Sequence, residues 1–214
     1  MSFMAFPKIG DQIYETLLKQ ILDHKLKPGE RLVEEQLGRD LGVSRTPLRD
    51  AINALAKDGF VKIEPRRGAS VREFQLKDLI ELYDIRMALE GLAAKLAAGN
   101  IDHSVLERLG NEFKENDVRL LLKADTNLHK IIIESCGNVK LQETLINLGN
   151  LVQAFRTAGY KSTSRSKAAT VFHIKIVKAL MNGDGEVAEK LMREHIEKTK
   201  IEIVQEFQTK ADNN

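Results

Sequence analysis

The chain reads Gly42-Val43-Ser44-Arg45-Thr46-Pro47-Leu48-Arg49-Asp50-Ala51-Ile52-Asn53-Ala54-Leu55 over the stretch that decides its fold. Ser44 is a suitable N-cap residue, and Pro47 stands in the first turn, where a missing backbone N–H costs little. Gly59 follows a few residues later and is typical of a helix end. The stretch therefore predicts a helix that begins after Ser44 and stops before Gly59.

The two sides of this predicted helix differ in chemistry. At about 100° per residue, one side gathers apolar residues and another gathers polar ones. The apolar side holds Leu48, Ile52 and Leu55, and the polar side holds Thr46, Arg49 and Asn53. Arg, Asn and hydroxyl side chains are suited to base edges and phosphates, and Arg45 lies at the helix start, where a groove is first met. By itself the helix is equally compatible with an ordinary solvated surface, so the flanking segments decide.

The flanks predict a complete winged helix-turn-helix. Residues 11–26 have apolar residues at helical spacing, residues 33–41 form a second short helix, and Gly42 allows a sharp turn into the third. Residues 60–63 and 69–71 alternate like two strands, and between them lies the basic turn 65–68.

Several motifs in this region resemble the DNA-binding domain of the GntR family of bacterial transcription regulators. The matching segments are Pro28-Gly29-Glu30-Arg31-Leu32, Leu41-Gly42-Val43-Ser44-Arg45-Thr46-Pro47-Leu48-Arg49, Leu55-x-x-Asp58-Gly59-Phe60 and Arg67-Gly68. The resemblance covers about the first third of the chain and implies a double-stranded DNA operator as partner. It implies that the DNA contacts are Ser44, Arg45, Thr46 and Arg49 on the helix, with Arg66, Arg67 and Gly68 on the wing. Glu35 stands where some relatives have a basic residue, so no contact is assigned there.

The charge distribution supports a site-specific DNA-binding protein. Residues 44–72 hold seven Lys and Arg against three Asp and Glu, although the whole chain carries only +2. Basic character is therefore concentrated where DNA would lie, whereas a protein that coats DNA without specificity is normally more basic overall.

The composition predicts two domains without disulfides. A chain of 214 residues with 43% hydrophobic content can build two cores, here expected over residues 1–75 and 76–214. Cys136 is the single cysteine, so no intrachain disulfide can form, and we expect it to be a buried apolar residue. No segment approaches the roughly 18 apolar residues of a membrane span, so we expect a cytoplasmic protein without membrane contact.

The second domain is predicted to be an all-α antiparallel bundle, which makes the whole chain mainly α. Helical periodicity without a convincing strand continues from Leu76 to near the end of the sequence. The expected helices are residues 76–98, 104–113, 118–136, 139–158, 166–181 and 186–207. Ser104-x-x-Glu107 is expected to form a capping box at the start of the second of these helices.

A possible metal-binding constellation lies within this bundle. Asp125 and His129 are four residues apart on one predicted helix, while His173 and His195 lie on two others. One carboxylate oxygen and three imidazole nitrogens suit a divalent transition metal such as zinc, nickel or manganese. The alternative is that the histidines are hydrogen-bonded core residues among apolar neighbours.

The same region resembles the FCD effector domain of one GntR subfamily. The matching segments are Asp84-Ile85-Arg86-x-x-Leu89-Glu90, Asp125-x-x-Leu128-His129 with Asn138, His173-x-x-Ile176-x-x-Ala179-Leu180 with Gly183-Asp184, and Ala188-x-x-x-Met192-x-x-His195-Ile196. This looser resemblance implies that Asp125, His129, His173 and His195 bind the metal. The chain differs from the family pattern at Phe172, a position where many relatives have an acidic residue.

The charge of such a site indicates its ligand. Three neutral imidazoles and one carboxylate leave a divalent ion with about one positive charge, and an octahedral ion keeps open positions. A small carboxylate fits both, and Arg86 matches a family position near the effector and could bind a further carboxylate. The alternative for Arg86 is a salt bridge to Asp84 or Glu90.

These observations predict a regulator rather than an enzyme, most simply a repressor, the commoner sense in the family. A homodimer would place two winged helices on a pseudo-palindromic operator, and an organic acid at the metal would favour one pose of the domains. Two alternatives stay open, a metal-dependent enzyme and a regulator whose metal is purely structural.

Overall fold

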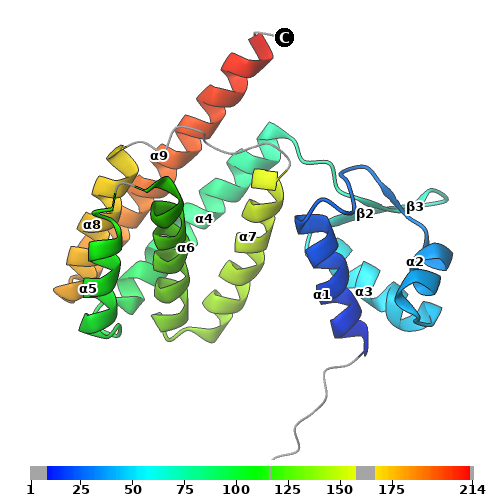
Figure 1. Ribbon diagram of the computed structural model, residues 1–214, viewed down its shortest axis with the longest axis horizontal. Coiled ribbons are helices and arrows are strands. Elements are labelled where there is room, and N and C mark those ends of the chain that lie inside the picture. The colour runs from blue at the N-terminus through cyan, green and yellow to red at the C-terminus, as the bar shows by residue number, and fades with distance from the viewer. Residues whose placement is uncertain (1–8, 116, 158–166, 213–214) are drawn as a thin grey trace, which may run out of the picture. The chain divides into compact units, whose positions relative to one another are not determined.

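The computed structural model describes residues 9–115, 117–157 and 167–212, which form two compact units (Figure 1). The first unit runs to Gln75 and also takes in the chain from Asn150 to the end of helix α7. The second unit contains the rest of the described chain, residues 76–115, 117–149 and 167–212.

The first unit is a winged helix-turn-helix, as the sequence predicted. Its elements are α1 (Ile9–Leu22), β1 (Arg31–Leu32), α2 (Glu34–Leu41), α3 (Arg45–Lys57), β2 (Val61–Glu64) and β3 (Gly68–Val71). The three strands form an antiparallel sheet in the order β1-β3-β2, with Val61 opposite Val71 and Glu64 opposite Gly68. The fully enclosed side chains of its core are Leu17, Leu48, Leu55 and Phe60.

Two details of this unit differ from the sequence prediction. Helix α1 ends at Leu22 rather than Leu26, because His24 adopts a left-handed φ of 57° and Leu26 then folds into the core. Strand β1 was not expected, since a two-residue strand has too little length to show an alternating pattern. The turn between α2 and α3 does follow the prediction, because Gly42 ends α2 with a left-handed φ of 66°.

The second unit is all-helical in its described part. Its helices are α4 (Leu76–Ala97), α5 (His103–Glu112), α6 (Val118–Ser135), the first part of α7 (Val139–Thr157), α8 (Lys167–Met181) and α9 (Gly185–Asp212). Helix α4 packs along α9 and against α6, while α8 packs against α9 and α5. Enclosed apolar side chains fill the space between them, among them Leu79, Leu106, Leu128, Ile132 and Ile176. Cys136 is buried, in agreement with its expected apolar role.

Local contacts explain where these helices begin and how closely they approach. Asp102 caps α5 by accepting hydrogen bonds from the Ser104 backbone N–H at 2.7 Å and the Ser104 hydroxyl at 2.6 Å. The expected capping box at Ser104 was therefore wrong by two residues, since Asp102 fills the N-cap position. A Cβ at Gly185 would lie 2.7 Å from the carbonyl oxygen of Lys95, so glycine permits the close approach of α9 to α4.

Within the described residues, none of the helices has both the length and the apolar character that crossing a membrane requires.

Candidate functional site

Helix α3 buries one face and exposes the residues that were predicted to contact DNA. Leu48, Ala51, Ile52 and Leu55 point into the core. All four predicted contact residues of the helix are exposed: Ser44, Arg45, Thr46 and Arg49. Ser44 is the N-cap residue in extended conformation, but its side chain makes no capping hydrogen bond. Its hydroxyl is thus available for another partner.

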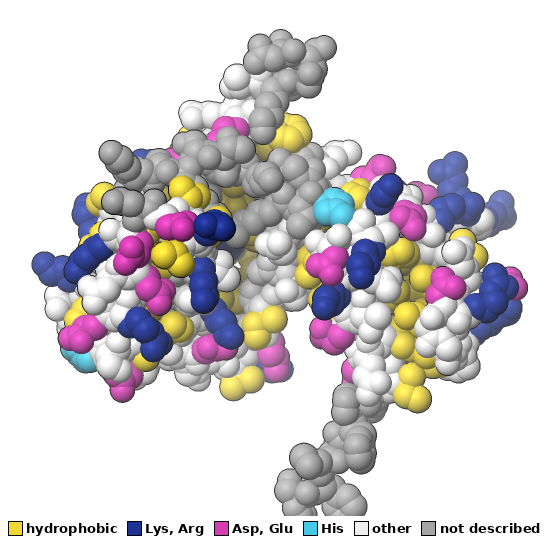
Figure 2. Space-filling view, in the orientation of Figure 1, with side chains coloured by type: hydrophobic (Ala, Val, Ile, Leu, Met, Phe, Trp, Pro, Cys, Tyr) yellow, Lys and Arg dark blue, Asp and Glu magenta, His cyan; other side chains and the backbone are white. Residues whose placement is uncertain are grey.

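The hairpin of β2 and β3 presents a cationic tip. Arg66, Arg67 and Gly68 are all exposed there, and Figure 2 shows Lys and Arg side chains gathered over this end of the first unit. Arg66 and Gly68 take left-handed φ values of 65° and 82°, which turn the chain tightly at the tip. The guanidinium of Arg31 donates to the carbonyl oxygen of Arg67, so strand β1 supports the wing.

A carboxylate organises the cations at the base of this wing. Glu64 lies 2.8 Å from the Lys62 ammonium and 3.8 Å from the Arg67 guanidinium. The hydrogen bond and the charge of Lys62 lower the pKa of Glu64. The wing therefore keeps its negative charge paired and leaves an excess of positive charge at the tip.

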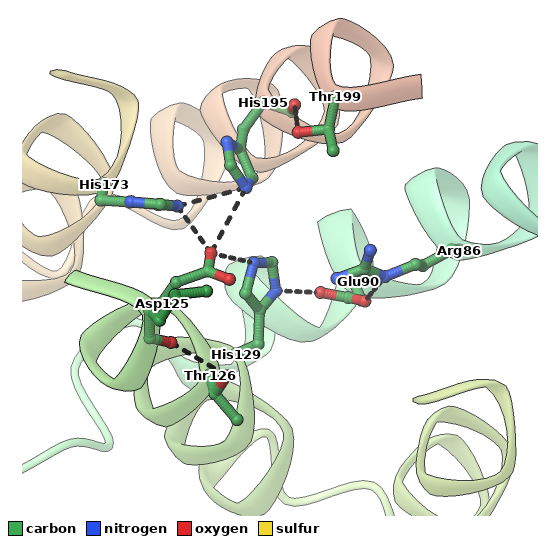
Figure 3. Close-up of polar contacts among 9 residues, drawn as sticks. Arg86, Glu90, Asp125, Thr126, His129, His173, His195 and Thr199 are labelled. Atoms are coloured by element: carbon green, nitrogen blue, oxygen red, sulfur yellow. Dashed lines mark hydrogen bonds and ion pairs between the residues drawn. The ribbon is translucent and has the colours of Figure 1, made fainter. Parts of the chain in front are cut away.

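The second unit brings the four predicted metal ligands together (Figure 3). Asp125 and His129 come from α6, His173 from α8 and His195 from α9. One donor atom from each side chain lies within 4.8 Å of the others. The Asp125 Oδ1 atom is 3.0 Å from Nε2 of His173, 3.5 Å from Nε2 of His129 and 4.0 Å from Nε2 of His195.

The spacing and chemistry of these donors fit a divalent transition metal. The Nε2 atoms of His173 and His195 are 3.2 Å apart. Ligand distances of about 2.0–2.2 Å place neighbouring donors about 3.0–3.5 Å from each other. One carboxylate oxygen and three imidazole nitrogens are also ligands that zinc, nickel and manganese accept.

A buried chain of charged groups extends this cluster toward α4. The ring of His129 contacts Glu90 through Nδ1, and Glu90 in turn accepts a hydrogen bond from Nε of Arg86 (Figure 3). Because Nδ1 is held by the Glu90 carboxylate, Nε2 of His129 faces Asp125, where it would offer a lone pair to a metal ion that displaced its proton. Glu90 thus sets the orientation in which His129 can act as a ligand.

The electrostatics of the cluster favour a cation beside Asp125. Burial alone would lower the pKa of His129, but the carboxylates of Glu90 and Asp125 raise it to about 9. Burial would raise the pKa of Glu90, yet Arg86 and His129 lower it to about 2. Burial and the neighbouring His173 and His129 hold the pKa of His195 well below its usual value. The cluster accordingly combines a charged His129 with a His195 whose lone pair is available.

Aromatic packing restrains a second candidate ligand, His173. The ring of Phe113 stacks on the ring of His173 with centroids 4.6 Å apart. Phe113 is itself enclosed in the core at the end of α5. Rotation of His173 is therefore restricted, which favours one orientation of its Nε2 atom.

Arg86 occupies a more enclosed position than an effector-binding residue would need. It is buried, its Nε atom is bound to Glu90, and its guanidinium carbon lies 5.3 Å from the ring centre of Tyr83. Of the two salt-bridge partners considered from sequence, Glu90 takes this role, since Asp84 pairs with Lys200 at 2.7 Å. A role for Arg86 in effector binding stays a prediction.

Sequence reasoning did not assign Glu90 and Phe113 to the site. Glu90 was considered only as a salt-bridge partner of Arg86, four residues earlier on the same helix. A buried acid facing the helix that carries His129 is visible only after the helices are packed. Phe113 gave no signal, because one aromatic residue at a helix end is ordinary core material.

The fold and these two regions define the class of the protein, a two-domain DNA-binding transcription regulator. The sequence profile described as "Bacterial regulatory proteins, gntR family" matches residues 9–71, and the "FCD domain" profile matches residues 81–198. The chain therefore belongs to the GntR family, in the group that carries an FCD domain.

Individual relatives agree with this assignment. An uncharacterized HTH-type transcriptional regulator of Bacillus subtilis is 29% identical over 86% of each chain. The probable D-xylose utilization operon transcriptional repressor of Paenarthrobacter nicotinovorans is 30% identical over 88% of this chain and 85% of its own. The structure of McbR/YncC from Escherichia coli superimposes with a TM-score of 0.71 at 21% identity, over 94% of this chain and 100% of the other. The Bacillus and Paenarthrobacter relatives are described as a transcriptional regulator and a probable transcriptional repressor, not as enzymes.

Proposed function

We propose that the protein is an operator-specific repressor whose hold on DNA is controlled by a small organic acid bound at a divalent metal ion. The observation that carries the proposal is the convergence of Asp125, His129, His173 and His195 within 4.8 Å in the helical unit. The name of the Paenarthrobacter relative, a probable repressor, supports the sense of regulation.

The DNA-binding half of the proposal assigns α3 to the major groove and the wing to the neighbouring backbone. Ser44, Arg45, Thr46 and Arg49 would read or position the duplex, since all four are exposed at the N-terminal end of α3. Arg66, Arg67 and Gly68 would contact phosphates from the wing. A homodimer would double this surface and match a pseudo-palindromic operator in the cytoplasm, where bacterial DNA lies.

In the regulatory half, the four side chains would hold zinc, nickel or manganese. When bound, the ion would supply open coordination positions that accept a carboxylate. The chain itself contributes orientation, because Glu90 fixes His129 and Phe113 packs against His173. Asp125 and Glu90 carry two negative charges against the single positive charge of Arg86, so a further cation is favoured beside them, either the protonated ring of His129 or a metal ion that replaces its proton.

Elemental analysis of tag-free protein tests the metal assignment. We expect about one equivalent of a divalent transition metal per chain, bound by the four-donor site. An Asp125→Ala/His129→Ala variant should lose it, whereas a His103→Ala control, altered at an exposed histidine of α5, should keep it. Metal retained in full by the double variant would refute the site assignment.

Titration with carboxylic acids then tests regulation. The affinity of the metal-loaded protein for its operator should change when a recognised acid is added. The affinity of the double variant should stay the same.

A structural role for the ion is the second candidate, and a specific observation favours it. The ligands come from three helices, so a bound ion would tie α6, α8 and α9 together whether or not an acid binds. In that case the metal would raise the melting temperature, and no carboxylate would alter DNA affinity.

A further inference from the structure

An ion pair joins the start of α2 to the predicted DNA-reading face of α3. Nε of Arg49 donates to both carboxylate oxygens of Glu34, at 2.9 and 2.8 Å. Glu34 is the first residue of α2, and Arg49 lies in the second turn of α3. The Arg49 side chain is 65% exposed and that of Glu34 is 34% exposed, so the acid lies behind the arginine and the arginine faces solvent.

The geometry leaves the useful edge of the arginine open. A guanidinium has five N–H donors, and only the one on Nε is directed at Glu34. The two terminal nitrogens can present a parallel pair of donors, which matches the N7 and O6 acceptors of guanine. Glu34 therefore restrains Arg49 at the nitrogen that such a bidentate contact does not use.

We propose that Glu34 is a positioning residue for operator recognition, which holds the Arg49 guanidinium in the orientation needed for a bidentate contact with the edge of a guanine base. The inference rests on the proposed DNA-binding role of α3. Holding the side chain before DNA arrives removes part of the entropy cost of ordering it in the complex.

The negative charge of Glu34 allows a positioning role to be distinguished from a direct electrostatic effect on DNA binding. A carboxylate near the DNA surface repels phosphates and weakens binding to every sequence alike. Glu34 can therefore favour the operator only through the arginine that it orients, and its benefit must appear as discrimination between sequences.

The neighbouring Glu35 provides a matched control. It lies one residue further along α2 and pairs with Arg39, four residues later on the same helix, at 2.9 Å. Both of these side chains are largely exposed, and neither contacts α3 through this pair. Glu34→Gln and Glu35→Gln thus remove the same charge from adjacent positions, but only the first alters the partner of Arg49.

The experiment uses the full-length chain and a duplex enriched from a randomised DNA library by the unaltered protein. Dissociation constants are measured for this duplex and for a scrambled duplex at one salt concentration. We expect Glu34→Gln to lower the ratio of the two affinities about three- to tenfold, because the arginine loses its restraint. Glu35→Gln should leave the ratio unchanged while strengthening binding to both duplexes slightly.

An Arg49→Ala background separates positioning from structure. There, Glu34→Gln should cause no further loss of discrimination, because the residue through which it acts is gone. A Glu34→Gln variant that weakens binding to both duplexes equally, with a lower melting temperature, would show a structural tie only and overturn the inference. A response identical to that of Glu35→Gln would also overturn it. Failure of the unaltered protein to enrich any sequence would instead refute the proposed function, and the inference with it.

Discussion

Arg86 and Glu90 place two opposite charges inside the helical unit, with exposed fractions of only 8% and 4%. A buried ion pair stabilises the folded state little more than apolar residues of similar size would, because both charged groups lose their hydration. Its benefit here is geometric, since the same carboxylate orients His129. Both the stability of the fold and the proposed metal site therefore depend on Glu90.

Removal of Glu90 should be costly even without metal. In Glu90→Ala, Arg86 would remain buried and unpaired, and we expect a loss of about 3–5 kcal/mol in the free energy of unfolding. Chemical denaturation in the presence of a chelator measures this. Glu81→Ala, on the exposed side of the same helix, should change stability by less than about 0.5 kcal/mol. Equal effects of the two substitutions would contradict the buried-pair interpretation.

The candidate ligands show how much of the site can be predicted from residue types and their spacing. Asp125 and His129 share a helix face by spacing alone, so their proximity could be predicted. His173 and His195 could be assigned to two further helices, but their approach to within 3.2 Å depends on how α8 packs on α9. Glu90 stayed hidden because its decisive partner lies 39 residues away.

Helix α3 should contribute most of the sequence discrimination at the level of single elements. Arg45 is its first residue and is exposed, so Arg45→Ala removes a donor at the end of the helix that first meets a groove. We expect a loss of about 1–3 kcal/mol in operator binding, measured by fluorescence anisotropy at fixed salt. Arg108→Ala, which alters an exposed arginine of α5, is the control. Unchanged operator affinity in Arg45→Ala would exclude this part of the recognition surface.

The N-cap of α5 gives a pH-dependent prediction. Hydrogen bonds from Ser104 lower the pKa of Asp102 below its ordinary value of 3.8. Asp102 therefore binds a proton more readily in the unfolded chain than in the folded one. The charged cap stabilises the fold at pH values above the ordinary pKa, and this contribution is lost as the pH falls through the folded pKa. Asp102→Asn keeps a capping oxygen without the titration.

The variant should therefore lose less stability than the unaltered protein between about pH 4 and pH 2. Parallel thermal melts across this range provide the measurement. Superimposable pH profiles would show that the Asp102 charge has no role in the cap.

The elements themselves were largely predictable, because their ends carry local signals. Gly42 and the Ser44–Pro47 start define the turn into α3, and both are local in sequence. The last residue of α1 could not be predicted, because Leu26 continues the apolar spacing of the helix. In the structure Leu26 lies in the turn after α1, and its side chain is buried from there. Likewise β1 exists only through its pairing with β3, which is a long-range contact.

At the scale of the whole molecule, α4 carries a second apolar face. Opposite its buried side, Ile85, Leu92 and Leu96 are 52%, 38% and 37% exposed. Their spacing of seven and four residues places them on one stripe. A symmetric pairing of two chains through such a stripe would bury it twice and supply the dimer that the proposed operator requires.

Leu92→Glu should therefore shift the protein from dimer to monomer, because it places a charge in the centre of the stripe. Operator affinity should fall with it, since one winged helix covers only half of a palindromic site. Analytical ultracentrifugation measures the assembly state. Val139→Glu, at an exposed apolar residue of α7, should leave it unchanged. A dimer that persists in Leu92→Glu would place the interface elsewhere.

The origin of the four candidate ligands in α6, α8 and α9 has a consequence for the cell as well as for the molecule. An ion that binds only the folded chain stabilises it by about 2.7 kcal/mol when its free concentration is a hundred times the dissociation constant. Chains that fold without the ion would open more often and be degraded sooner. Metal supply would then set how many copies of the regulator exist, and a starved cell would release its target genes through the turnover of the protein, before any acid is sensed.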